Sequence, residues 1–328
     1  MRILFAGSPG IALPALERAA AEHEVVGVLT NPEAAAGRGL SAARTPVAEA
    51  ASRLGLPVLA FGRLGPESRD AVEPLGAELL VSFAYGRVFG PRFLALFPRG
   101  GLNIHPSILP RWRGAAPIPY AILNRDSETG VSVQAIAPEL DSGDLYAVER
   151  IRLDGTETTE SLSARAAAIG ADLLSRVLAD IAAGRASPQP QTGEPSWCGI
   201  VAKEEGAIDW NRSAMEIDAR VRAMYPWPLA YTRLRGARLN VLEVRPFPDE
   251  PPQGLPPGTV VGLDKARGIM VQSGNGLIAL RRLQMQTKKA LPYREFANGV
   301  RDLAGVVLGD VEDAALGPSA GQEPGSKR

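Results

Sequence analysis

The sequence predicts an α/β fold: a Rossmann-like, mostly parallel sheet followed by a small β-barrel domain of OB type. Apolar runs at 3–7 and 25–30 flank a helical segment at 14–21, and this β-α-β rhythm is typical of parallel strands covered by helices. Five short β-like runs then follow one another between 230 and 283, as in a small barrel. A stretch rich in Pro, Gly, Ser and Gln at 184–206 separates the two patterns.

The same reasoning places the remaining elements. Short apolar runs are typical of buried strands, and Ala-rich runs with helical spacing are typical of helices. Ser213 is a good N-cap for a helix at the start of the second domain. Residues 33–43 (EAAAGRGLSAA) have neither pattern, and we expect a flexible loop there. We expect strands at 79–83, 102–105, 131–135, 145–151, 230–234, 239–244, 259–263, 268–272 and 277–283, and helices at 46–54, 159–183 and 213–224.

A chain of 328 residues is long enough for two domains. We expect an α/β domain at 1–188, a linker at 189–206, an OB-like domain at 207–308 and a disordered tail at 309–328, where apolar residues are few. The apolar start MRILF is too short for a signal peptide or a membrane span. We therefore expect a cytoplasmic protein without a membrane partner, and a monomer.

The residue inventory excludes several kinds of site. With one Cys and two His, the chain has no intrachain disulfide, no cysteine zinc cluster and no H-E-x-x-H motif, so we expect no metal. Residues 1–200 contain no Lys, which excludes a Walker-type phosphate loop there. The first strand leads into G-S-P-G rather than G-x-G-x-x-G, which disfavours a dinucleotide-dependent oxidoreductase.

Charge is divided unequally along the chain. The 36 Lys and Arg balance the 36 Asp and Glu, and this total alone argues against a nucleic-acid partner. Residues 1–200 hold 18 Arg against 21 acidic residues, a net charge of −3, whereas 207–301 hold 15 basic against 8 acidic residues, a net charge of +7. A basic patch such as Arg281, Arg282, Lys288 and Lys289 can follow RNA phosphates, although each of these side chains also fits a solvated barrel face.

The densest group of polar residues lies at the end of one predicted strand. Asn103 and His105 are two residues apart, so both side chains point to the same face, and Pro106 ends the strand. An amide donor beside an imidazole suits a reaction that builds negative charge on a carbonyl oxygen and moves a proton. Asp141, in the loop after the next long strand, can orient the imidazole.

A purely structural interpretation of these residues also exists. Asn103 can cap the turn at Pro106, and Asp141 before Ser142-Gly143 fits an ordinary β-turn. The segment 111–113 (RWR) fits a solvated loop. The combination of polar groups around one strand end favours the functional interpretation.

The string NIHPSILPRWRGAAP at 103–117 resembles the signature of the folate-dependent formyltransferases. Its PRWRGAAP part is similar to the methionyl-tRNA branch of that family, and LDSGD at 140–144 is similar to the family's second active-site segment. The resemblance spans about residues 1–300. Further segments that resemble the family are FAGSP (5–9), AGRG (36–39, a tRNA-contacting loop), AKEE (202–205), IDW (208–210) and YPWP (225–228).

The resemblance implies formyl transfer from 10-formyltetrahydrofolate, the co-substrate, to the free amino group of methionyl initiator tRNA, without a metal. It implies that Asn103 and His105 stabilise the oxyanion and that His105 and Asp141 move the protons. The folate site that it implies comprises Ser82, Phe83, Ala84, Tyr85, Gly86, Ser107, Ile108, Leu109, Pro110 and Leu140. Together with the charge pattern, it implies that the tRNA is bound by Arg38, Arg111, Arg113, Arg281, Lys288 and Lys289.

Two other functions fit part of the pattern. A formyltransferase that acts on a small amine, such as a nucleotide-linked amino sugar, would use the same Asn103, His105 and Asp141 without needing a basic barrel. A tRNA-binding protein with a vestigial catalytic domain would need no such trio, so the three intact residues argue against it.

Overall fold

The computed structural model describes residues 1–36, 41–300 and 302–309, which fall into two compact units. Unit 1 comprises Met1–Ala121 and Asp126–Ile200, and unit 2 comprises Ile122–Arg125 and the described residues from Val201 on. Within these ranges, no helix has both the length and the apolar character needed to cross a membrane.

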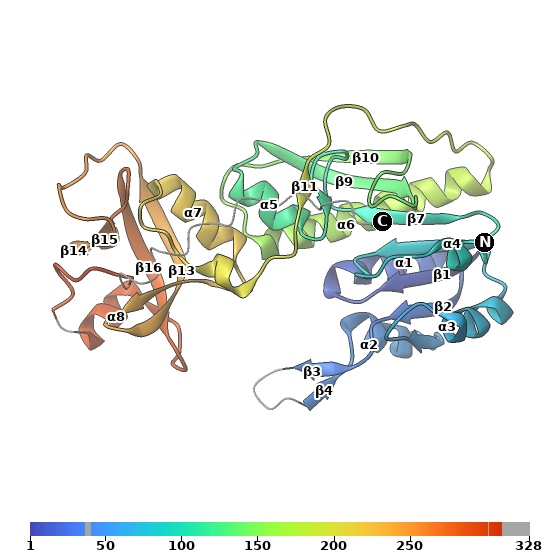
Figure 1. Cartoon of the computed structure of the whole chain (residues 1–328), viewed down its shortest axis with the longest axis horizontal. Helices are drawn as coiled ribbons and strands as arrows, with labels where there is room; N and C mark the ends of the chain where they lie inside the picture. The colour runs from blue at the N-terminus through green and yellow to red at the C-terminus, as the bar shows by residue number, and fades with distance from the viewer. Residues whose placement is uncertain (37–40, 301, 310–328) are drawn as a thin grey trace, which may run out of the picture. The chain divides into compact units, whose positions relative to one another are not determined.

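A seven-stranded sheet forms the centre of unit 1, and Figure 1 shows β10, β9, β7, β1 and β2 in that order from top to bottom. Its five strands from β7 to β5 are parallel, whereas β9 runs antiparallel to β7 and to β10. The predicted mostly parallel sheet is thus confirmed. In spatial order the strands are β10 (Leu145–Arg152), β9 (Glu128–Ala135), β7 (Gly101–His105), β6 (Leu79–Phe83), β1 (Arg2–Gly7), β2 (Glu24–Thr30) and β5 (Val58–Ala60).

Alternation along the strands directs apolar side chains to both faces of this sheet. Leu4 and Ala6 of β1 pack with Val72 of α3 and Phe93 of α4 on one face. On the other face α6 approaches closely enough for its Gly170 to lie against the side chain of Phe83, and α6 packs against α1. The helices of unit 1 include α1 (Leu13–Glu22), α2 (Pro46–Arg53), α3 (Pro66–Val72), α4 (Pro91–Leu94) and α6 (Thr159–Ala182), while α5 spans Pro117–Leu123.

The strand order creates a switch point beside β1. The chain leaves β1 for β2 and β5 on one side and returns to β6 on the other side. Open α/β sheets bind ligands outside the carboxyl ends of the strands at such a point. Here the segments that follow β1 and β6 start at Ser8 and Ala84.

Unit 2 is built on an antiparallel sheet, so the predicted second, β-rich domain is confirmed. The described pairings form an open path from β12 to β14, and the OB-like closure stays a prediction. α7 (Ala214–Ala223) packs against β13, and α8 (Tyr293–Gly299) against β16. In spatial order the strands are β12 (Ala230–Leu234), β13 (Ala237–Phe247), β16 (Leu277–Met285), β15 (Gly268–Gln272) and β14 (Val260–Asp264), and β17 (Leu291–Pro292) pairs with β16.

Two segments differ from the sequence-based expectation. The prediction of a loop throughout 33–43 is wrong at its ends, because β3 (Ala34–Ala36) pairs antiparallel with β4 (Ser41–Ala43). Three-residue strands are too short to produce a detectable apolar pattern. Within the expected linker, Gln189 pairs with Leu145, and β11 (Trp197–Cys198) pairs with β8 (Arg113–Gly114), so the segment up to Ile200 belongs to unit 1. The expected tail from 310 on lies outside the described residues.

Candidate active site

Asn103, His105 and Asp141 meet at the carboxyl end of β7. Asn103 Nδ2 donates a hydrogen bond to Asp141 Oδ1 at 3.3 Å. His105 Nδ1 lies 3.6 Å from Asp141 Oδ2, which is beyond the range of a direct hydrogen bond. The side chains of His105 and Asp141 are only 5% and 8% exposed, so water screens their interaction little. The Asn103 side chain therefore faces Asp141. The structural interpretation of this residue was a cap on the turn at Pro106.

The carboxylate of Asp141 also accepts hydrogen bonds from N–H groups of two further elements. Gln134 Nε2, on buried β9, donates to Oδ1 at 2.8 Å, and the backbone N–H of Gly114 donates to Oδ2 at 2.9 Å. Gly114 has φ +117°, and a Cβ there would lie 2.2 Å from the carbonyl oxygen of Cys198. Only glycine fits this close approach. Three N–H donors therefore fix the orientation of this carboxylate.

The second nitrogen of His105 contacts a backbone carbonyl. Nε2 lies 2.8 Å from Trp112 O, and because a carbonyl only accepts, this nitrogen carries the proton. Trp112 has φ +58°, an uncommon conformation for a bulky residue, and it is held by Ser196 Oγ on its backbone N–H at 2.9 Å. Asp126 Oδ2 accepts from the Trp112 indole at 2.7 Å. The imidazole orientation therefore depends on the 111–114 segment as well as on Asp141.

The expected folate segment turns sharply after β6. Ala84 and Gly86 have φ +51° and +80° and are exposed, whereas the side chains of Ser82, Phe83 and Tyr85 are buried. Burial raises the pKa of Tyr85, whose hydroxyl has no hydrogen-bond partner among the described residues. The segment consequently offers mainly backbone groups to a ligand, and its buried side chains are part of the core.

Asn31, which the sequence analysis did not single out, holds this turn against the switch point. Its Nδ2 donates to Tyr85 O and to Ser8 Oγ, both at 2.9 Å, and its Oδ1 accepts from Arg87 Nε at 2.6 Å. The segments after β1, β2 and β6 are thus joined by one side chain. A lone Asn after a strand carries no motif, so only the tertiary arrangement identifies it.

The other residues of the expected folate site lie in two loops. Ser107 is buried and donates to Arg111 O at 2.6 Å, and Leu109, also buried, donates its backbone N–H to Ser132 Oγ at 3.2 Å. Ile108 and Pro110 are half-buried, and Leu140 is 53% exposed. Ser107 and Leu109 therefore fix the loop, while Ile108, Pro110 and Leu140 present surface.

The two arginines of the RWR segment both have side-chain partners, and Arg111 is also exposed to solvent. Arg111 forms two hydrogen bonds with Asp126, at 3.1 and 2.5 Å, and its guanidinium lies 4.8 Å from the Trp112 ring centroid. Asp126 raises the pKa of Arg111. Arg113 donates to Gln191 Oε1 at 3.2 and 2.8 Å.

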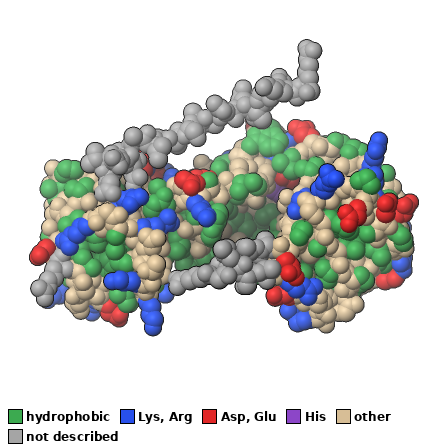
Figure 2. Space-filling model, turned by 60° about the horizontal axis from the view of Figure 1, so that its bottom comes forward, with side chains coloured by type: hydrophobic (Ala, Val, Ile, Leu, Met, Phe, Trp, Pro, Cys, Tyr) green, Lys and Arg blue, Asp and Glu red, His purple; other side chains and the backbone are tan. Residues whose placement is uncertain are grey.

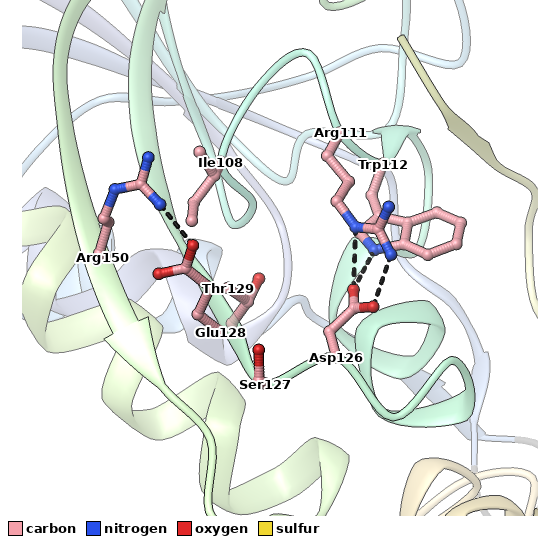
Figure 3. A pocket seen from close by; sticks show the side chains of 8 residues that line it. All are labelled: Ile108, Arg111, Trp112, Asp126, Ser127, Glu128, Thr129 and Arg150. Carbon is pink, nitrogen blue, oxygen red and sulfur yellow. Dashed lines mark hydrogen bonds and ion pairs between the residues drawn. The ribbon is translucent and has the colours of Figure 1, made fainter. Parts of the chain in front are cut away.

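A cavity of about 290 Å³ adjoins Arg111 (Figure 3). Arg111 with Asp126 lies on one side of it, and Arg150 with Glu128, 2.5 Å apart, lies on the other. Its lining residues include none of Asn103, His105 and Asp141. The cavity is therefore separate from the candidate catalytic trio. Both arginines in its wall are paired with carboxylates.

The cationic residues expected to bind RNA differ in whether they are paired with a carboxylate. Arg281 Nε lies 3.3 Å from Glu243 Oε1, whereas Lys288 and Lys289 are exposed and form no ion pair with the described part of the chain. Figure 2 shows one face of unit 2, on its left, where blue cationic side chains predominate over red acidic ones. Arg38 lies outside the described residues.

The site can stabilise an oxyanion and move protons. Asn103 supplies an amide donor, His105 a ring that is hydrogen-bonded through Nε2 and faces Asp141 with Nδ1, and Asp141 a desolvated carboxylate. The described residues contain no group of three or more His, Cys, Asp or Glu that could hold a metal ion.

The chain is similar to known proteins over most of its length. A family profile described as "Formyl transferase" matches residues 1–178, and one described as "Formyl transferase, C-terminal domain" matches 200–301. A protein of Treponema pallidum (strain Nichols) named "Methionyl-tRNA formyltransferase" is 45% identical over 91% of this chain and 96% of its own length. One of the same name from Roseiflexus sp. (strain RS-1) is 40% identical over 98% of this chain and 99% of its own length.

Solved structures resemble the fold at lower identity. HypX from Aquifex aeolicus, as a four-residue variant, aligns with a TM-score of 0.62 and 19% identity, covering 90% of this chain and 48% of that protein. WlaRD, described as a sugar 3N-formyl transferase, aligns with a TM-score of 0.62 and 16% identity over 88% of this chain and 99% of its own. Because both profiles match in order and the relatives are similar over nearly their full length, this chain belongs to the formyl transferase family, together with the proteins named methionyl-tRNA formyltransferase.

Proposed function

We propose that the protein is a methionyl-tRNA formyltransferase, which transfers the formyl group of 10-formyltetrahydrofolate to the amino group of methionyl initiator tRNA. The observation that carries this proposal is the Asn103–His105–Asp141 group, with the side chains of His105 and Asp141 buried, in a chain 45% identical, over 91% of its length, to a protein of that name. The charge of +7 over residues 207–301 supports an RNA acceptor independently.

Asn103 is placed to stabilise the formyl oxygen. Its amide nitrogen has two hydrogens, and the contact with Asp141 uses one of them. The second hydrogen is donated to the oxygen as the methionyl amine attacks the formyl carbon and negative charge develops. A hydrogen bond from an oriented donor in a site with little water is strongest when the negative charge on the formyl oxygen is largest, which is in the transition state.

His105 and Asp141 carry the proton balance. The new C–N bond leaves the attacking nitrogen with one proton too many, and the broken C–N bond leaves the folate nitrogen one proton short. With Asp141 assisting its removal, the first proton passes to Nδ1 of His105, and the imidazolium that results delivers a proton to the leaving nitrogen, so His105 returns to its starting state. Free α-amino groups have a pKa of about 7.7–8.0, so the attacking amine needs no covalent activation.

The folate is held by exposed backbone and apolar surface. The turn at Ala84 and Gly86 offers peptide groups, and Ile108, Pro110 and Leu140 offer apolar contact. The RNA is held by exposed cations of unit 2, among them Lys288 and Lys289. Arg38, Arg111, Arg113 and Arg281 are further candidates for RNA contact.

Product analysis with two acceptors tests the proposal. The full chain is incubated with 10-formyltetrahydrofolate and either methionyl initiator tRNA or a nucleotide-linked amino sugar, and the products are identified by mass spectrometry. We expect formyl-methionine on the tRNA and no product on the sugar. Formylation of the sugar alone contradicts the proposal and supports a small-amine formyltransferase.

We further propose that the enzyme acts in the cytoplasm as a monomer. Its tRNA and folate substrates belong to that compartment, and each unit has its own buried core. Light scattering of the purified chain across a range of concentrations checks the monomer, with a dimer mass as the contrary result.

A further inference from the structure

Gln191 connects the two loops that orient the candidate catalytic groups. Its Nε2 donates to Asp141 O at 2.8 Å and to Gly143 O at 2.9 Å, and it lies 3.3 Å from Gln134 Oε1. Its Oε1 accepts both hydrogen bonds of Arg113, which neighbours Gly114. One side chain thus joins the Asp141 loop to the segment that contacts His105.

The orientation of the Gln191 amide is fixed by chemistry. Carbonyl oxygens can only accept and a guanidinium can only donate, so the nitrogen faces the carbonyls and the oxygen faces Arg113. The two amide hydrogens are committed to the two shorter contacts, with Asp141 and Gly143. A side chain with all its strong donors and acceptors used restricts both loops more than one bond does.

The Asp141 loop needs such support. Asp141 has φ +50°, in the left-handed region that is unfavourable for a residue other than glycine. Buried Gln134 donates to Oδ1 of the Asp141 carboxylate at 2.8 Å. The Oε1 of Gln134 is in turn the third acceptor near Gln191 Nε2. Gln134 therefore fixes the carboxylate, and Gln191 fixes the backbone that carries it.

We infer that Gln191 is a positioning residue for formyl transfer: it sets Asp141 and the 112–114 segment at the distances that His105 requires. This inference rests on the proposed function for its kinetic consequence, and on geometry alone for its effect on the loop. Gln191 touches none of the reacting atoms. Because misplacement by about 1 Å costs on the order of 100-fold in rate, its loss lowers kcat rather than substrate affinity.

Two substitutions at this position and one matched control test the inference. Gln191→Glu keeps the oxygen that faces Arg113 but replaces the donor to the two carbonyls, and Gln191→Ala removes both contacts. Gln189→Ala is the control in the same segment, since the Gln189 side chain is exposed and, among the residues that the structure describes, bonds only to Ser187. The pairing of Gln189 with Leu145 uses backbone atoms and is retained.

The expected result has two parts. In Gln191→Glu, kcat for methionyl-tRNA formylation falls about 10-fold or more, while KM for both substrates stays within about twofold and the Tm is unchanged. By hydrogen exchange, the amides of 135–145 exchange at least about 10-fold faster than in the wild type. Gln191→Ala shows the same changes, and Gln189→Ala shows neither.

Other outcomes overturn the inference. Wild-type kcat in Gln191→Glu contradicts it, whether or not exchange changes, and so does a fall in kcat accompanied by a lower Tm or a raised KM. If the wild type and Gln189→Ala form no product on tRNA, the proposed function has failed. In that case unchanged exchange in Gln191→Glu overturns the inference, and faster exchange supports it.

Discussion

Cys198 shows how burial controls the chemistry of a single residue beside the site. Its Sγ lies 3.5 Å from Trp112 O, the same carbonyl that His105 contacts, and 3.3 Å from Arg113 O. Burial raises the pKa of the thiol to about 11. A thiol in this state is a weak donor to the two carbonyls and a poor nucleophile, so we assign Cys198 a packing role.

Alkylation kinetics check this account of Cys198. At pH 8, a thiol with a pKa of about 11 is about 0.1% thiolate, whereas an ordinary cysteine is about 25% thiolate. We expect iodoacetamide to modify the native chain more than about 100-fold more slowly than the chain in denaturant, measured by intact mass. Equal rates in the two states contradict the burial of the thiol.

At the same scale, some residues of the candidate site can be predicted from the sequence and others cannot, for a definite reason. Two residues separated by one on a strand share a face, so Asn103 and His105 could be placed together from spacing alone. Gln134 and Gln191 contact each other only because β9 and the segment after α6 are brought together by folding. A lone glutamine has no motif, so no local pattern announces it.

Among the elements, α7 is the one whose start is most clearly encoded. Ser213 Oγ accepts from the backbone N–H of Glu216 at 3.3 Å, and Glu216 Oε2 accepts from the backbone N–H of Ser213 at 2.9 Å, which makes a capping box. Glu216 Oε2 also accepts from the Ser213 hydroxyl at 2.6 Å. These bonds lower the pKa of Glu216 from its usual 4.5. A lowered pKa in the folded state stabilises the fold above pH 4.5, and this stabilisation is lost as the pH falls through the folded-state pKa.

Replacement of the cap tests this link. At pH 7, Ser213→Ala lowers the free energy of unfolding by about 1 kcal/mol, because the N-cap bond is lost. The difference from wild type shrinks below pH 4.5, since protonated Glu216 no longer gains from the Ser213 hydroxyl. Urea unfolding across pH 3–7 measures both, with Glu216→Gln as the control that does not titrate. A difference that is constant with pH contradicts the assignment.

Element prediction succeeded where patterns were long or strictly bounded. The strands at 230–234 and 268–272 have the same bounds in the structure, and the helix at 159–183 ends within one residue of α6. Sequence patterns did not predict α3, α4 and β5, which have seven, four and three residues. Elements this short show less than two turns or two alternations, so periodicity cannot define them.

For the whole molecule, the division of charge is the property that connects sequence to substrate. Although the net charge of the whole chain is zero, residues 207–301 carry a net charge of +7 and residues 1–200 a net charge of −3. The exposed Lys288 and Lys289 lie between β16 and β17, with no ion pair to any described residue. Cations of this kind bind RNA by releasing condensed counterions from its phosphates.

Salt dependence of tRNA binding tests the role of these lysines. Each phosphate contact contributes about 0.7–0.9 to the slope of log affinity against log salt, so the double substitution Lys288→Ala, Lys289→Ala reduces the slope by about 1–2. Arg185→Ala is the control, since Arg185 is exposed in unit 1 and paired with Asp180. An unchanged slope in the double variant places the RNA elsewhere.

The rate of a single turnover in His105→Ala tests the central claim most directly. Enzyme in excess is mixed with 10-formyltetrahydrofolate and methionyl initiator tRNA, and formyl-methionine is followed over time alongside the Kd for tRNA. Because His105 supplies the proton transfer but no RNA contact, we expect the rate to fall by about 100-fold or more with the Kd within about twofold of wild type. A rate within about threefold of wild type at unchanged Kd would contradict the proposed role of His105.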